Sequence, residues 1–199
     1  MKKFDLEKEN GRSMIEMLGV LAIIGVLSVG GIAGYSKAMM KYRINKTIEQ
    51  ITLIAGNVRA FFALQKSYKG LNNKKVIKKA KLVPDEMWNT SGTELTNMFG
   101  GFFYLDSTFK DDNAQQDATF TFYLTNLPQE ACIEILTQDW SEAGITFILT
   151  SIYDKENPQN AFLITPISID TATQNCGNVN DLSFHFDSDP YADIFSRYR

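Results

Sequence analysis

The stretch GRSMIEMLGVLAIIGVLSVGG, residues 11–31, decides how this chain is organised. Between Ser13 and Lys37 the only charged side chain is that of Glu16. A helix needs about 20 apolar residues to cross the hydrocarbon core of a bilayer, so residues 17–36 are enough to form a membrane-spanning helix. An acid at the start of such a segment needs a physical reason.

The composition of the whole chain is that of a folded protein. It has 199 residues, of which 44% are hydrophobic and 22% are charged, enough for one globular domain and an additional segment. The net charge of −3 gives no sign of the strongly basic surface that is typical of nucleic-acid-binding proteins. We therefore expect no direct nucleic-acid binding.

Three interpretations fit the apolar run. A secretory signal peptide would be cut at a small-residue site, for which Gly31-Ile32-Ala33 is a candidate. A signal anchor would keep the segment uncleaved. The third interpretation uses Gly11 and Glu16 together, because a short polar leader ends at the glycine and the acid follows five residues later.

This arrangement resembles the start of a type IV prepilin. The leader is MKKFDLEKENG, and Glu16 is the fifth residue after it, at the opening of the hydrophobic helix. The resemblance implies that a prepilin peptidase cuts between Gly11 and Arg12 and that Arg12 is then a candidate for N-methylation. Arg12 is a departure, since most members of the family place Phe or Met there. Its side chain can still snorkel to the lipid phosphates.

The position of Glu16 has an electrostatic explanation in this family. A carboxylate in hydrocarbon costs about 3 kcal/mol, and a helix macrodipole recovers only about 0.3 to 1 kcal/mol of it. Cleavage would create an α-amine on Arg12, which is cationic at neutral pH because the pKa of such amines is about 8. The resemblance implies that Glu16 pairs with this amine of a neighbouring subunit during assembly. The alternative places Glu16 in the headgroup layer as an ordinary acid of a helix N-terminus.

The helical period continues beyond the membrane segment. Apolar residues recur at spacings of three and four: Ile44, Ile48, Ile51, Ala55, Val58 and Phe62. Polar side chains fall off this stripe at Lys46, Glu49, Gln50, Asn57 and Arg59. We expect a single helix from about Arg12 to Ser67, closed by Lys69-Gly70, with its second half packed on a globular domain.

The remainder reads as β structure with short helices. The block LNNKKVIKKAKLVPDEMW, residues 71–88, predicts a short helix with a solvated lysine face that stops at Pro84. A patch that binds nucleic acid or an anionic surface is the alternative. Gly100-Gly101 fits a turn or bulge before a strand. Strands are expected at 118–125, 145–153, 162–169 and 182–187, and a helix within LPQEACIEILTQDW, residues 127–140. Pro166 predicts an edge strand or a bulge.

The cysteines predict one disulfide. Cys132 and Cys176 are the only two, and a chain delivered across the inner membrane meets an oxidising compartment. Two free thiols in a cytosolic protein are the alternative. The segments LPQEAC and NCGNVNDLSFHF resemble the type IVb pilin pattern, in which a disulfide ties an inner helix to the last strand region. The loop between the cysteines would then form the exposed face of a fibre.

The sequence contains few residues that could support catalysis. His185 is the only histidine, and its strand-like context FHF predicts a half-exposed strand residue. No nucleophile motif, CxxC or glycine-rich phosphate loop is found, so we expect no enzyme and no cofactor. Asp187, Asp189 and Asp193 are a weak calcium candidate, since Ca²⁺ takes six to eight oxygen ligands.

These observations predict an α+β fold: a pilin-like roll in which one long N-terminal helix, membrane-spanning in its first half, packs on an antiparallel β-sheet, with one disulfide. Residues 1–11 would be the cleaved leader and residues 12–36 the transmembrane and assembly half of the helix. Residues 37–199 would form the globular pilin domain, including the amphipathic half of the helix.

The resemblance implies the function of a type IVb pilin subunit. Such a subunit waits in the bacterial inner membrane as a single-pass protein, is cut by prepilin peptidase, and is polymerised by the inner-membrane assembly machinery into an extracellular pilus. The fibre would serve adhesion, aggregation, motility or DNA transfer. A minor pilin or a type II secretion pseudopilin would share the N-terminal features. An alternative of another class is a signal-anchored envelope enzyme or binding domain.

Overall fold

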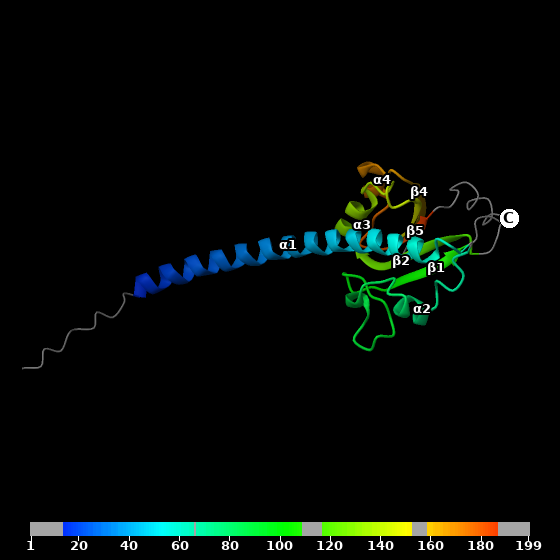
Figure 1. Ribbon diagram of the computed structural model, residues 1–199. Coiled ribbons are helices and arrows are strands. Elements are labelled where there is room, and N and C mark those ends of the chain that lie inside the picture. Colours follow the sequence, from blue (N-terminus) through cyan, green and yellow to red (C-terminus); the bar gives the residue numbers. More distant parts are fainter. Residues whose placement is uncertain (1–13, 66, 109–116, 153–158, 187–199) are drawn as a thin grey trace, which may run out of the picture. The chain divides into compact units, whose positions relative to one another are not determined.

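A computed structural model describes residues 14–65, 67–108, 117–152 and 159–186 (Figure 1). The helices are α1 (Met14–Phe62), α2 (Lys74–Lys79), α3 (Gln129–Leu136) and α4 (Ile169–Gln174), with a 3-10 turn η1 at Asp85–Met87. The strands are β1 (Phe103–Thr108), β2 (Thr119–Pro128), β3 (Ile145–Ile152), β4 (Gln159–Ile164) and β5 (Val179–Phe186). Two compact units divide the chain between Lys41 and Tyr42, within α1.

Helix α1 is 49 residues long and continues without a break through the glycine cluster at residues 30–34. It ends at Phe62, so the expected end at Ser67 is wrong. Phe62 is the last buried residue of the apolar stripe, whereas Leu64 is fully exposed. Since helices in proteins are stabilised mainly by packing of their apolar face, the helix stops where that packing stops. The Gln65 amide then donates to the Phe62 carbonyl and forms a turn.

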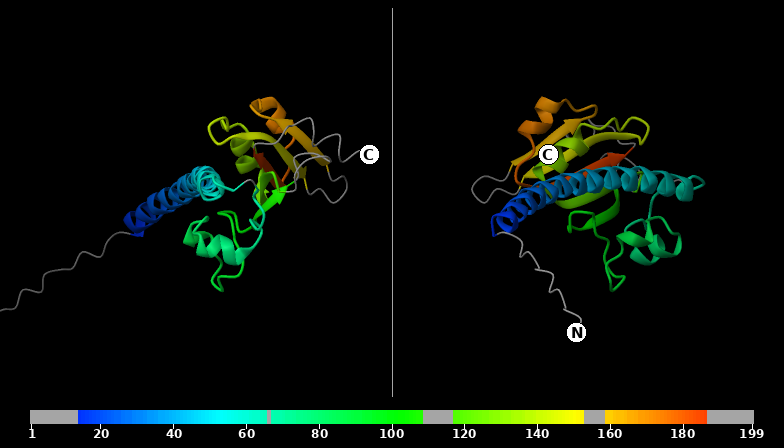
Figure 2. Two further views of the ribbon diagram at one scale, coloured as in Figure 1. Left: turned by 45° about the vertical axis from the view of Figure 1, so that its right-hand side comes forward. Right: turned by 90° about the vertical axis from the view of Figure 1, so that its left-hand side faces the viewer.

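Five antiparallel strands form one sheet in the order β1-β2-β5-β3-β4. Strand β5, the last one in the described residues, is therefore inserted between β2 and β3 (Figure 2). On one face, Phe120 of β2 and Phe186 of β5 stack with ring centroids 4.4 Å apart. The Arg59 guanidinium of α1 lies over both rings, at 5.8 and 5.7 Å. These contacts place the second half of α1 against this face of the sheet.

The order of strands corrects the expectation for His185. This side chain is 1% exposed rather than half-exposed, because its strand lies between two others and its register partners are Thr121 of β2 and Phe147 of β3. The ring stacks on Phe147 of β3, with centroids 4.2 Å apart, and its Nε2 atom lies 3.0 Å from the Ser183 hydroxyl. His185 is therefore part of the packed interior of the sheet.

The strand expected at residues 162–169 is displaced. The observed strand β4 ends at Ile164, so Pro166 follows the strand instead of interrupting it. Ile169 begins helix α4, whose N-cap Ser168 accepts a hydrogen bond from the Thr171 amide. An N-cap serine favours a helix start, and this signal was not used in the sequence interpretation. The expectation of an edge strand is confirmed, because β4 lies at the edge of the sheet.

Helix α2 is shorter than expected and ends before Pro84. Lys81 has φ +50°, and the Leu82 amide donates to the Ile77 carbonyl over 3.1 Å. This is a Schellman ending, in which a left-handed residue turns the chain and two apolar side chains meet. Ile77 and Leu82 are both buried, so burial of these two residues determines where the helix ends.

The turn at Gly100-Gly101 is confirmed, and it leads directly into β1. Gly100 has φ +80°, and the buried Asn97 accepts hydrogen bonds from the Phe99 and Gly101 amides through its side-chain oxygen. Its side-chain nitrogen donates to the Thr125 carbonyl over 2.7 Å. The turn is thus bonded to the neighbouring strand β2.

Gly101→Ala is expected to lower the free energy of unfolding by about 3 kcal/mol, because a Cβ there would overlap the Thr125 carbonyl, a backbone atom that cannot move freely. Gly56→Ala is the matched control. Gly56 lies in the helix interior with open space around it, so alanine should stabilise by about 0.5 to 1 kcal/mol. Urea denaturation of both variants measures the difference. Equal effects would contradict the close backbone approach.

Candidate assembly surfaces

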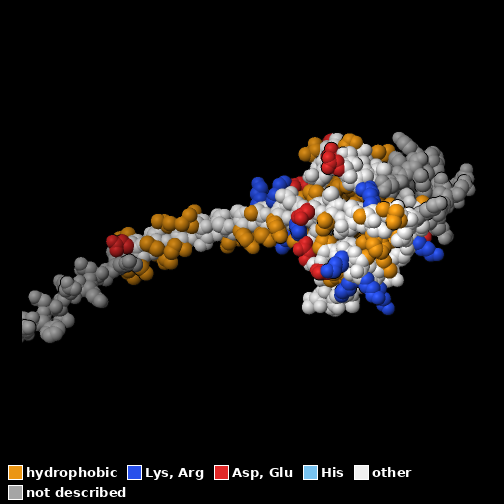
Figure 3. All heavy atoms as spheres, viewed as in Figure 1, with side chains coloured by type: hydrophobic (Ala, Val, Ile, Leu, Met, Phe, Trp, Pro, Cys, Tyr) orange, Lys and Arg blue, Asp and Glu red, His pale blue; other side chains and the backbone are white. Residues whose placement is uncertain are grey.

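The first half of α1 presents apolar side chains to its surroundings over its whole circumference. All residues from 14 to 38 are exposed, as the orange side chains along the helix in Figure 3 illustrate. Within the described residues, α1 is the one helix that is long and apolar enough to cross a membrane, judged by length and composition. Exposed apolar surfaces of this extent mark sites of contact with lipid or with other protein chains.

Glu16 lies in the first turn of α1 and is the only charged residue from Met14 to Ser36. Gly11 and Arg12, the residues of the expected cleavage site, lie outside the described residues. Five glycines follow Glu16 along the helix, at Gly19, Gly25, Gly30, Gly31 and Gly34, and none has another atom near its missing Cβ. Glycines of this kind let helices approach each other closely, so this half of α1 suits packing against further helices.

The second half of α1 is built differently, because one side of it is buried. Ile44, Ile51 and Val58 of the predicted stripe are completely buried, and so is Ile54, which the stripe did not include. The stripe is thus confirmed as the face that holds the helix on the globular unit.

The expectation for Gln50 is wrong. It was expected on the polar side of the helix, but its side chain is buried, with 3% of its surface exposed. Its side-chain nitrogen donates to the Glu86 carboxylate over 2.9 Å, and Lys46 lies 3.3 Å from the same carboxylate. The hydrogen bond from Gln50 lowers the pKa of Glu86 most, and the hydrogen bond from Lys46 lowers it further. Glu86 in turn raises the pKa of Lys46. A buried polar residue needs such a partner, and the partner lies 36 residues away in η1.

The two cysteines form the expected disulfide. Cys132 lies in α3 and Cys176 lies between α4 and β5, with their Cα atoms 5.9 Å apart. Both are buried, and the Gln129 side chain donates to the Cys176 carbonyl over 3.0 Å. The bond therefore joins the two helices that flank strands β3 and β4.

Helix α3 also confirms its expected position. Its residues Ala131, Ile135 and Leu136 are buried, and Pro128 precedes its first turn. The Trp140 indole donates to the Ile135 carbonyl over 2.9 Å and meets Phe184 of β5 edge-on. Helix α3 is therefore anchored to the sheet by an aromatic contact as well as tied to α4 by the disulfide.

Catalytic and metal-binding groups do not gather in the described part of the chain. There, no group of three or more His, Cys, Asp or Glu side chains is placed to hold a metal ion. His185 serves packing, as described above. The weak calcium candidates Asp187, Asp189 and Asp193 lie outside the described residues.

The N-terminal helix is exposed in its first half, the second half packs on an antiparallel sheet, and a disulfide lies in the C-terminal half of the chain. This is the architecture of a type IV pilin, which is a structural subunit and not an enzyme. The family model described as PilS N terminal matches residues 41–185. The chain belongs to this family.

Two curated relatives and one solved structure agree with this assignment. The chain is 24% identical over 190 residues to the major structural subunit of bundle-forming pilus of Escherichia coli O111:H-, covering 88% of this chain and 93% of the relative. It is 23% identical over 187 residues to the subunit of the same name from Escherichia coli O127:H6, with the same coverage. The crystal structure of a type IV b pilin from Salmonella typhi matches its fold with a TM-score of 0.54 and 16% identity, covering 72% of this chain and 99% of that one.

Proposed function

We propose that this chain is the subunit of a type IVb-like pilus and that it polymerises through the first half of α1. The observation that carries the proposal is the contrast within one helix: residues 14–36 are exposed and almost entirely apolar, whereas one side of the helix from Ile44 onward is buried on the globular unit. Exposing so much apolar surface to water is unfavourable, so the first half needs a bilayer or other helices around it. Such a segment can exchange one for the other on assembly.

Before assembly, the subunit is held in the bacterial inner membrane by one pass of α1. Prepilin peptidase removes residues 1–11 by cutting between Gly11 and Arg12, and Arg12 is the site of N-methylation. The inner-membrane assembly machinery then transfers the subunit into an extracellular fibre. The names of the two Escherichia coli relatives, major structural subunits of a bundle-forming pilus, support a major rather than a minor subunit.

Within the fibre, Glu16 pairs with the α-amine of Arg12 in the next subunit. Glu16 is the only acid in the apolar half of the helix, and the amine is the cation that cleavage creates next to it in sequence. An unpaired charge is costly in an apolar environment, so a pair of opposite charges that forms between subunits favours the assembled state. It also sets the axial offset of neighbouring helices, because the two groups lie at the same end of the chain.

The processing step is tested by expressing the full chain with and without a prepilin peptidase and measuring its intact mass. We expect the chain to begin at Arg12 only when the peptidase is present, with the mass of one added methyl group. A Gly11→Leu variant is the control and should begin at Met1 under both conditions. A wild-type chain that begins at Met1 in both would contradict the proposal and indicate a signal anchor. One that begins at Gly34 would indicate a secreted domain.

A further inference from the structure

The segment around α2 is basic in a chain that is acidic overall. Residues 69–95 hold six lysines against three acids, Asp85, Glu86 and Glu94, a net charge of +3, whereas the whole chain has −3. The six are Lys69, Lys74, Lys75, Lys78, Lys79 and Lys81, and all have exposed side chains. We call these six lysines the basic surface.

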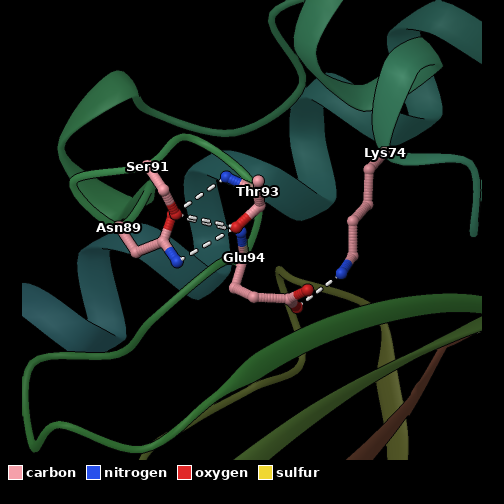
Figure 4. Close-up of polar contacts among 5 residues, drawn as sticks. All are labelled: Lys74, Asn89, Ser91, Thr93 and Glu94. Atoms are coloured by element: carbon pink, nitrogen blue, oxygen red, sulfur yellow. Dashed lines mark hydrogen bonds and ion pairs between the residues drawn. The ribbon is translucent and has the colours of Figure 1, made fainter.

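Two lysines of the basic surface hold the segment in shape. Lys74 forms an ion pair with Glu94, as Figure 4 shows, and Asn89 accepts hydrogen bonds from the Thr93 and Glu94 amides through its side-chain oxygen. The Lys78 ammonium lies 5.1 Å from the centre of the Trp88 ring. These contacts fix α2 to the turn at residues 89–94.

The other lysines of the basic surface are free to meet a partner. Within the described residues, the Lys69, Lys75, Lys79 and Lys81 ammonium groups have no ion pair or hydrogen bond. Binding an acidic surface would cost these lysines part of their side-chain rotamer freedom. The backbone beneath them is already fixed, so ordering it adds no further cost.

The C-terminal half of the chain has the opposite charge. The described residues 129–152 and 159–181 contain six acids and no lysine or arginine. Five of them, Glu130, Glu134, Asp139, Glu142 and Asp170, belong to α3, to the turn after it and to α4, and we call these the acidic surface. Glu130 and Glu142 are exposed and have no ion pair or hydrogen bond with another described residue. The disulfide between Cys132 and Cys176 fixes the two helices that carry this surface.

The two surfaces lie on opposite sides of the globular unit. In every view of Figures 1 and 2, α2 is on one side of the second half of α1, and α3 and α4 are on the other. In Figure 3 the blue side chains of α2 and the red side chains over α4 are correspondingly far apart. A single copy therefore cannot bring its own two surfaces together.

We infer that the basic surface of one copy binds the acidic surface of the next copy. The partner is a second copy of this chain because that copy provides the complementary charge on a separate face. A contact between two different faces can be repeated by every further copy, and it generates a filament when the rotation between copies does not close into a ring. Complementary charge gives such a contact its register and its selectivity. This inference rests on the proposed pilus function and adds to it the contact between globular units.

Cross-linking of assembled fibres tests the contact directly. Fibres are made from equal amounts of nitrogen-14 and nitrogen-15 full-length chain and treated with a carbodiimide, which joins lysine to carboxylate without a spacer. We expect peptides that join a lysine of residues 74–81 to an acid of residues 130–142 or to Asp170, with the two isotopes mixed between the halves. Absence of such mixed-isotope pairs in intact fibres would overturn the inference.

Charge reversal provides the second test. Lys75→Glu with Lys79→Glu should reduce fibre yield roughly tenfold or more, since opposing like charges across an interface costs several kcal/mol and about 1.4 kcal/mol is tenfold. Glu130→Lys with Glu142→Lys should do the same, and the four changes together should restore fibres. Lys75→Arg with Lys79→Arg is the control and should assemble as the wild type does.

The outcomes separate the two proposals. A wild-type chain that forms no fibre defeats the proposed function itself. Wild-type fibres combined with charge-reversed variants that assemble normally defeat only the contact between the two surfaces, and would leave the basic surface to an anionic partner of another kind. Loss in both reversed pairs without rescue in the combined variant would also overturn the contact.

Discussion

Replacing Glu16 by alanine is expected to reduce fibre yield about hundredfold, since removing one partner of a desolvated charge pair costs about 3 kcal/mol and about 1.4 kcal/mol is tenfold. The neighbouring α-amine would be left in an apolar environment without its counter-charge. Insertion into the membrane should be unaffected or improved, because alanine is less costly than a carboxylate in hydrocarbon. The measurement is the ratio of sheared fibre to membrane-bound subunit.

Glu16→Asp is the matched control for this result. It keeps the negative charge one methylene closer to the backbone, so it should retain part of the yield that alanine loses. Fibre yield that is unchanged in Glu16→Ala would contradict the pairing and favour the headgroup alternative, in which Glu16 is only an acid of the helix N-terminus.

Removing the disulfide is expected to have the largest effect on folding of the globular unit. Cys132 and Cys176 are 44 residues apart in sequence, and in the chain-entropy model closing such a loop contributes about 4 kcal/mol. That is a large part of the roughly 5 to 15 kcal/mol that stabilises an ordinary domain. The variant with both cysteines changed to serine should unfold at a clearly lower urea concentration, measured on the full-length chain in detergent.

Reduction of the wild-type chain is the comparison for this variant. Reduced wild type and the double serine variant should unfold at similar urea concentrations, because both lack the loop constraint. A loss below about 1 kcal/mol would contradict the prediction, since the chain-entropy model assigns several times more to a loop of this length. Because α3 and α4 carry the acidic surface, the same variant should also form fewer fibres.

Much of the fold could be predicted from residues that are close together in sequence. The period of apolar residues in α1 predicted its buried side, and the alternation in ATFTFYLT predicted β2. Pro128 and the apolar spacing after it predicted α3. These patterns succeed because they reflect geometry within a single helix or strand.

Other features depend on partners that are distant in sequence. The burial of Gln50 depends on Glu86, and that of His185 depends on strands β2 and β3 beside it. The end of α1 at Phe62 depends on where its packing surface ends. The pattern of residues along one segment does not show which distant residues will pack beside it. The sequence therefore predicted a solvated Gln50 and a half-exposed His185.

The sequence by itself determined the long helix with its apolar first half, the single acid within it and the one pair of cysteines, because each is a matter of residue type and spacing along the chain. Only the tertiary structure decided that β5 enters the middle of the sheet and that α2, which carries lysines, and α3 and α4, which carry acids, lie on opposite sides of the second half of α1. The reason is that strand order and the positions of surfaces follow from contacts between segments far apart in sequence, which only the folded chain brings together.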